Sequence, residues 1–95
     1  MRVKAGDIFE IPLLMDPHSG FQWEVLIPEE ATQLLTLLEF SLEGNSPAHA
    51  RRPITQRFRF RALTQGRTTL TFRYRRGGHI ARQERTVEVE IEAAG

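Results

Sequence analysis

The sequence predicts an all-β chain folded as an antiparallel β-sandwich, with one short helical turn near residues 29–34. Apolar and polar residues alternate over several short runs, which is the period-two pattern of strands with one buried face. Turn-forming residues separate these runs at short intervals. The composition, 40% apolar and 26% charged over 95 residues, is that of a globular domain rather than a disordered segment.

Two strands are expected in the N-terminal third, over residues 7–14 (DIFEIPLL) and 21–27 (FQWEVLI). A turn rich in Asp, Pro, Ser and Gly separates them. The following segment, PEEATQLLTLLEFSLE, is predicted to begin with the helical turn after Pro28 and to become a strand near Leu37. The first half of the chain therefore supplies three strands.

The clearest alternation comes later, over residues 55–62 (TQRFRFRA), 68–74 (TTLTFRY) and 86–93 (TVEVEIEA). The residues expected to face the core are Phe58, Phe60, Ala62, Leu70, Phe72, Tyr74, Val87, Val89 and Ile91. The opposite faces carry Arg, Thr and Glu. We expect these faces to be solvated, and any Arg–Glu pairs across strands to contribute about 0.2–1 kcal/mol each.

Length and composition restrict the organisation and the location of the protein. The chain suffices for a single domain over residues 1–95. It contains no cysteine, which excludes a disulfide framework and thiolate metal sites. No apolar run approaches the roughly 18 residues of a membrane span, and MRVKAGDIFE lacks the apolar centre of a secretory signal. We expect a soluble protein of the cytoplasm or the periplasm without a membrane partner.

The formal net charge of +1 argues against a strong attraction to nucleic acid. Arginines gather between Arg51 and Arg85, and those at Arg51-Arg52 and from Arg73 to Arg76 could contact phosphates. They are not accompanied by aromatic residues free to stack on bases. We therefore expect no nucleic-acid partner and no cofactor, and a monomer.

The stretch MDPHSGFQW raises the question of catalysis, because it brings Asp16, His18 and Ser19 together. A catalytic nucleophile and its base must meet at hydrogen-bonding distance, and neighbours in one tight turn rarely do so. In a turn, Asp and Ser bond to the backbone, Pro fixes φ and Gly permits a positive φ. We therefore expect a structural turn and no enzyme.

The three histidines, His18, His49 and His79, each fall in a different predicted loop. Loops at one end of a sandwich can converge, so three imidazoles could bind zinc or copper. Their spacing matches no metal motif, and no carboxylate accompanies them in a regular pattern. A metal site is an alternative that the sequence does not favour, and we expect none.

Residues 6–25 (GDIFEIPLLMDPHSGFQWEV) resemble the N-terminal part of the chagasin family of cysteine-protease inhibitors. In that family a strand leads into an Asn-Pro-Thr-Thr-Gly loop, followed by an aromatic residue and a Trp. Here the corresponding residues are Asp16, Pro17, His18, Ser19 and Gly20, and then Phe21 and Trp23. Residues 55–76 look like the family's later strands, with Gly66 in the turn and Tyr74-Arg75-Arg76 before the last binding loop.

The resemblance implies an immunoglobulin-like β-sandwich in which three loops at one end block the cleft of papain-like cysteine proteases without covalent reaction. The protease-binding residues it implies are Asp16, Pro17, His18, Ser19 and Gly20 in the first loop, Arg51, Arg52, Pro53 and Ile54 in the second, and Arg76, Gly77, Gly78 and His79 in the third. Phe21 and Trp23 would anchor the first loop in the core.

The loops also depart from the family's pattern. Arg51-Arg52-Pro53-Ile54 stands where the family has a glycine-rich loop, and Arg76-Gly77-Gly78 replaces Arg-Pro-Trp. In the first loop, Asp16 replaces an amide and His18 replaces a small hydroxyl residue. We expect weaker binding than is usual in the family. The alternative is a β-sandwich interaction module with retargeted loops and no protease inhibition.

Overall fold

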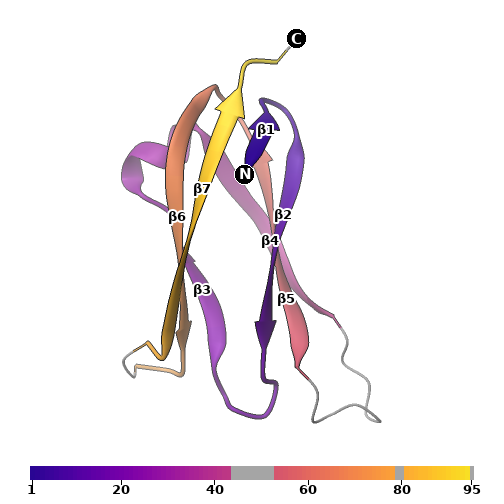
Figure 1. The fold of residues 1–95 in the computed structure, drawn as a ribbon, viewed down its shortest axis with the longest axis vertical. Helices are drawn as coiled ribbons and strands as arrows, with labels where there is room; N and C mark the ends of the chain where they lie inside the picture. The colour runs from indigo at the N-terminus through magenta and orange to yellow at the C-terminus, as the bar shows by residue number, and fades with distance from the viewer. Residues whose placement is uncertain (44–52, 79–80, 95) are drawn as a thin grey trace.

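Two β-sheets pack face to face in the computed structural model of the chain, which describes residues 1–43, 53–78 and 81–94 (Figure 1). The strands are β1 (Arg2–Lys4), β2 (Ile8–Met15), β3 (Gln22–Leu26), β4 (Leu35–Glu43), β5 (Ile54–Ala62), β6 (Gly66–Arg75) and β7 (Gln83–Glu92). A 3₁₀ helix, η1 (Glu29–Gln33), lies between β3 and β4. The predicted all-β sandwich and its helical turn are confirmed.

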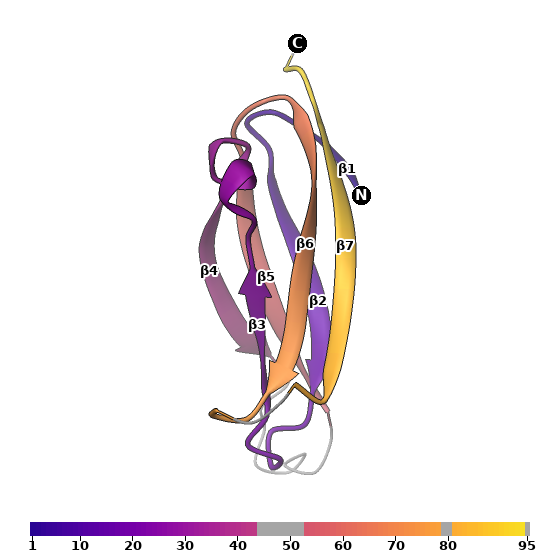
Figure 2. The ribbon, with the colours of Figure 1, turned by 90° about the vertical axis from the view of Figure 1, so that its left-hand side faces the viewer.

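One sheet has the strand order β1-β7-β6-β3 and the other the order β2-β5-β4. Figure 1 shows the sandwich edge-on, and Figure 2 looks onto the face of the first sheet, with β3, β6 and β7 in front. All strand pairs are antiparallel except β1–β7, which is parallel. The sequence prediction missed β1, because a strand of three residues is too short to show an alternation.

The alternation determines which side chains form the core. All but one of the predicted core residues of β5, β6 and β7 are buried, and Val87 is partly buried against the core. The β2 strand, at one edge of the three-stranded sheet, adds Phe9, Ile11, Leu13 and Met15 to the core. The Phe58 and Phe72 rings, one from each sheet, lie 5.2 Å apart between centroids, so the aromatic residues join the two layers.

The β4 strand begins at Leu35, two residues before the expected position, because Leu35 is buried and pairs with Ala62. A bulge between Leu37 and Glu39 shifts its register. Beyond the bulge, the Phe40 ring contacts Phe58 in a tilted arrangement, 5.7 Å between centroids, but Phe40 is 50% exposed. β4 is an edge strand of its sheet, and in Figure 2 it lies to the left of β3.

The charged outer faces form ion pairs across neighbouring strands. Arg59 pairs with Glu39 at 3.0 Å and Arg73 pairs with Glu84 at 3.0 Å. Both partners in each pair are more than 40% exposed, so each pair contributes at most about 1 kcal/mol. These ion pairs therefore add little to the stability of the sandwich.

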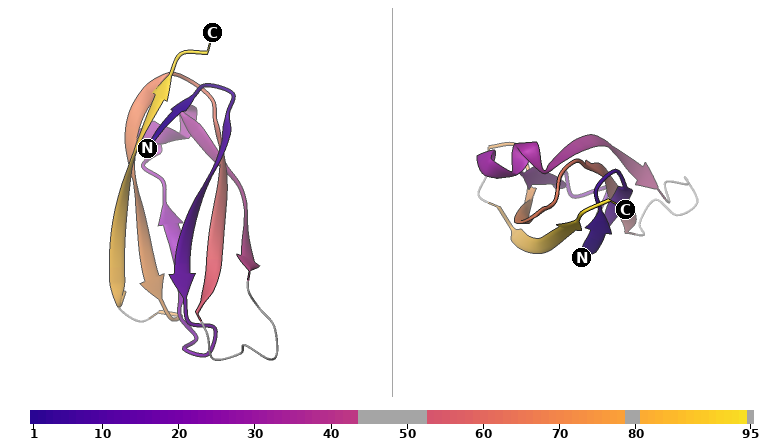
Figure 3. Two further views of the ribbon diagram at one scale, coloured as in Figure 1. Left: turned by 45° about the vertical axis from the view of Figure 1, so that its right-hand side comes forward. Right: turned by 90° about the horizontal axis from the view of Figure 1, so that it is seen from above.

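Three connections, β2–β3, β4–β5 and β6–β7, start and finish at the same end of the sandwich, here called the loop end (Figure 3). The strand register fixes this arrangement. Met15 pairs with Ile54 and Glu43 with Thr55 in one sheet, and Gln22 pairs with Arg75 in the other. The β5–β6 turn and the C-terminal end of β7 lie at the opposite end.

Candidate functional site

The β2–β3 connection is a turn held by its own side chains. The Asp16 carboxylate oxygen Oδ1 accepts the N–H of His18 at 2.9 Å, and the Asp16 carbonyl accepts the Ser19 hydroxyl at 2.9 Å. The same hydroxyl oxygen accepts the N–H of Phe21 at 3.1 Å. Gly20 has a φ of 78°, which favours glycine. The turn therefore has a defined shape before any partner binds.

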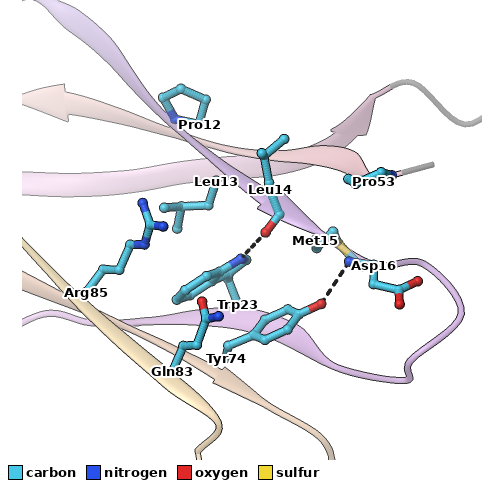
Figure 4. A pocket seen from close by; sticks show the side chains of 10 residues that line it. All are labelled: Pro12, Leu13, Leu14, Met15, Asp16, Trp23, Pro53, Tyr74, Gln83 and Arg85. Atoms are coloured by element: carbon cyan, nitrogen blue, oxygen red, sulfur yellow. Dashed lines mark hydrogen bonds between the residues drawn. The ribbon is translucent and has the colours of Figure 1, made fainter.

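Tyr74, near the end of β6, fastens this turn to the opposite sheet. Its buried hydroxyl accepts the N–H of Asp16 at 2.8 Å and lies 3.4 Å from the Ser19 hydroxyl (Figure 4). Beside it, the Trp23 indole N–H donates to the Leu14 carbonyl at 2.8 Å. The Trp23 and Tyr74 rings lie 4.9 Å apart. The two hydrogen bonds thus join the sheets at the loop end, and the aromatic contact links the neighbouring strands β3 and β6, which carry the indole donor and the hydroxyl acceptor.

Gln56 forms a third link that the sequence analysis did not identify. The Trp23 backbone N–H donates to Gln56 Oε1, and Gln56 Nε2 donates to the Trp23 carbonyl, both at 2.9 Å. Because β3 is an edge strand, the Gln56 amide occupies the place of a neighbouring strand. The side chain is 1% exposed. The signal was present, since Gln56 shares the buried face of β5 with Phe58.

The β6–β7 connection contacts the first turn through Phe21. The guanidinium carbons of Arg76 and Arg82 lie 5.4 and 5.0 Å from the centre of the Phe21 ring. A Cβ atom on Gly20 would lie 3.0 Å from Arg76 Cδ, so the Arg76 stem packs closely on that glycine. Each cation–π contact contributes roughly 0.5–1 kcal/mol at an exposed position. The first and third loops consequently form one connected surface.

The structure brings most of the expected binding residues to the loop end. Asp16, His18, Gly20, Pro53, Arg76, Gly77 and Gly78 are exposed there, and Pro17 and Ser19 are partly buried. Arg51, Arg52 and His79 lie outside the described residues. Ile54 requires a correction: it is the first residue of β5, its side chain is 3% exposed in the core, and it is not available to a partner.

The triad interpretation of the first turn does not fit the observed bonds. The Ser19 hydroxyl donates to the Asp16 carbonyl, and the Asp16 carboxylate accepts the backbone N–H of His18 rather than its ring N–H. A nucleophile bonded to an oriented base is therefore not formed. The metal interpretation involved His49 and His79, which lie outside the described residues. Within the described parts of the chain, no group of three possible metal-binding side chains occurs.

An open pocket of about 350 Å³ lies beside the turn, between β2 and the start of β7 (Figure 4). Trp23 and Tyr74 line it from one sheet, and Leu13 and Met15 from the other. Arg85 stands at its edge. The pocket is thus continuous with the loop end. In the residues that the structure describes, no helix has the length and apolar character needed to cross a membrane.

The family model described as "Chagasin family peptidase inhibitor I42" matches residues 2–91, nearly the whole chain. The chain belongs to the chagasin family of peptidase inhibitors. The resemblance of the first loop and the later strands is thereby confirmed. No curated protein matches the sequence.

Solved structures show the fold of this chagasin-family chain independently. A cysteine protease inhibitor from Entamoeba histolytica, EhICP2, has a TM-score of 0.71 at 20% identity, over 96% of this chain and 86% of the other. The solution structure of Amebosin has a TM-score of 0.67 at 19% identity, over 99% and 87% of the two chains. At these identities the structures establish a shared immunoglobulin-like architecture.

Proposed function

We propose that this chagasin-family protein is a reversible, non-covalent inhibitor of papain-like cysteine proteases that places its loop end in the active-site cleft. The observation that carries the proposal is the preformed turn Asp16–Gly20, held by the Tyr74 hydroxyl at the tip of the sandwich. One of the similar structures is described as a cysteine protease inhibitor, which supports this class of target.

The turn is suited to binding because its conformation is fixed in advance. Ordering a flexible loop on binding costs free energy, which a preformed loop avoids. The backbone of the turn is bonded within the chain through Asp16, Ser19 and Tyr74. The exposed His18 side chain is left at the surface, where it can contact a partner. Inhibition by shape alone requires this kind of rigidity.

The chemistry of the chain supports a non-covalent mechanism. The sequence contains no cysteine, so it cannot form a mixed disulfide with the protease thiolate. The Ser19 hydroxyl is already bonded to the Asp16 carbonyl and the Phe21 N–H. Binding to the protease should therefore be reversible, with an affinity set by packing and hydrogen bonds at the loop end.

The test is a titration of several papain-like enzymes with the protein, using a fluorogenic substrate. We expect competitive inhibition at micromolar concentration or below in at least one enzyme. The His18→Ala variant should raise the inhibition constant about fivefold, the effect of losing roughly 1 kcal/mol of contact. Gln65→Ala, in the exposed turn at the opposite end, is the matched control and should leave the constant unchanged.

His18 is preferable to Ser19 as the test position, because Ser19→Ala would also remove the bonds that shape the turn. The absence of inhibition at micromolar protein in all enzymes would refute the proposal. It would favour the alternative, an interaction module with the same fold and a different partner.

A further inference from the structure

The arginines of this protein divide into two groups by their partners. Those on the strand faces form ion pairs with glutamates: Arg2, Arg57, Arg59, Arg67, Arg73 and Arg75. Among the described residues, Arg61, Arg76, Arg82 and Arg85 have no carboxylate within ion-pair distance. All aspartates and glutamates of the sequence lie in the described ranges, so these arginines have no carboxylate side-chain partner elsewhere in the chain.

Three of these arginines, Arg76, Arg82 and Arg85, belong to the β6–β7 connection and the start of β7, and are called here the free arginine cluster. Arg76 directly follows β6, and the Arg82 N–H donates to the Tyr74 carbonyl at 2.8 Å. Arg85 pairs in register with the buried Phe72, so its side chain lies on the inner face of the sheet, at the pocket (Figure 4). Arg61 lies at the opposite end, where it pairs with Ile8.

The carboxylates near the loop end are already engaged. Glu84 pairs with Arg73, Glu24 with Arg75 and Glu43 with Arg57. Asp16 is the remaining one, and its Oδ1 accepts the N–H of His18. Three guanidinium groups against one carboxylate leave this end positively charged, although the whole chain is nearly neutral. The asymmetry is a property of the tip and not of the surface in general.

Building on the proposed function, we propose that the protease inhibited by this protein is a papain-like enzyme with Asp and Glu side chains on the rim of its active-site cleft. The free arginine cluster would attract that rim as the loop end approaches and pair with it on contact. An exposed charge acts over a Debye length of about 8 Å at physiological salt, so its main effect is on the association rate.

The placement of the guanidinium groups supports this role. Arg76 and Arg82 rest on Phe21, which restrains them without neutralising them. A planar, restrained guanidinium loses less freedom on pairing with a carboxylate than a free lysine would. A nucleic acid is a poorer match, since phosphate recognition uses a basic stripe along a backbone, and the strands beside this cluster carry glutamates.

The experiment measures the association rate constant with a papain-like protease that has rim carboxylates, at several salt concentrations. A second form of that protease carries the corresponding amides. The inhibitor variants are Arg85→Gln, the double change Arg82→Gln and Arg85→Gln, and the charge-matched control Arg61→Gln. We expect the double variant to associate about threefold to tenfold more slowly at low salt, with the difference disappearing in high salt.

Arg61→Gln should associate like the parent, and the amide form of the protease should respond equally to all variants. Retained inhibition with a double variant within twofold of the parent at low salt would overturn this inference alone. Failure of the parent to inhibit either protease would overturn the proposed function as well. Tight binding of a labelled DNA oligonucleotide that only the double variant loses would assign the cluster to nucleic acid and also overturn it.

Discussion

Removing one oxygen atom, by Tyr74→Phe, should loosen the first turn while leaving the core packed. The hydroxyl accepts the Asp16 N–H at 2.8 Å and lies 3.4 Å from the Ser19 hydroxyl. The ring contacts with Trp23 and Phe21, at 4.9 and 5.3 Å between centroids, remain in the variant. Any change in stability or inhibition therefore reports the hydrogen bond.

The expected loss of stability follows from that bond. A hydrogen bond contributes about 1 kcal/mol net, and leaving a partly buried N–H without a partner costs about 1–3 kcal/mol, so the free energy of unfolding should fall by about 1–2 kcal/mol. With a urea slope of about 1.5 kcal/mol/M, the midpoint should fall by about 1 M. If the freed turn must be ordered on binding, a cost of roughly 1.4 kcal/mol raises the inhibition constant about tenfold.

The assay combines urea unfolding, followed by the fluorescence of the single Trp23, with the protease titration. Ile91→Val is the matched control, because Ile91 is buried at the opposite end of β7, beside Gly66. It should cost a comparable 0.5–1.5 kcal/mol, roughly, without changing inhibition. Tyr74→Phe with an unchanged inhibition constant, or Ile91→Val with an equally weakened one, would refute the role given to the hydroxyl.

Two further predictions concern stability. Gln56→Leu leaves the Trp23 backbone N–H and carbonyl without partners, so urea unfolding should show a loss of about 2–4 kcal/mol; a loss below about 1 kcal/mol would contradict the bridging role. The hydrogen bond from Arg67 and the charge of Arg2 lower the pKa of Glu90 from its ordinary 4.5. The stability this gives is present above the unfolded-state pKa and is lost as the pH falls through the lowered one. Glu90→Gln should therefore unfold at lower urea than the parent at neutral pH and at the same urea in strong acid; a difference that persists in acid would contradict this assignment.

The fold could be predicted from the sequence because alternation is a direct consequence of strand geometry. In β5 and β6 every second side chain points inward, so Phe58 and Phe72 appear as core residues without coordinates. The same argument could not find β1, whose three residues are held by pairing with β7 from the far end of the chain. It placed the start of β4 two residues late, since the burial of Leu35 depends on its contact with the opposite strand.

The candidate site could be predicted only in part. Resemblance located the turn Asp16–Gly20, and its residues do form a bonded turn at the loop end. The Tyr74 hydroxyl, which holds the turn, comes from β6, and the Gln56 amide, which holds the following strand at Trp23, comes from β5; each is more than thirty residues from its partner. Sequence spacing does not show such contacts. The resemblance also placed Ile54 at the binding surface, whereas Ile54 pairs with Met15 in the sheet and its side chain is buried in the core.

The unpaired arginines could not be distinguished by sequence either. Arg75 and Arg76 are neighbours in the chain, yet Arg75 pairs with Glu24 on β3, while Arg76 turns onto Phe21. Which residues are neutralised depends on the strand register. The net charge of +1 for the whole chain consequently does not reveal the excess of positive charge at the loop end.

Protection of the protease thiol is the most direct test of how the loop end acts. A papain-like protease is treated with a thiol-alkylating reagent, with and without a saturating concentration of this protein, and labelling of the catalytic cysteine is followed in time. If the loop end occupies the cleft, labelling should slow at least tenfold and full activity should return when the complex is diluted. Unchanged labelling in an inhibited enzyme, or inhibition that dilution does not reverse, would contradict cleft occupation by a reversible, non-covalent inhibitor.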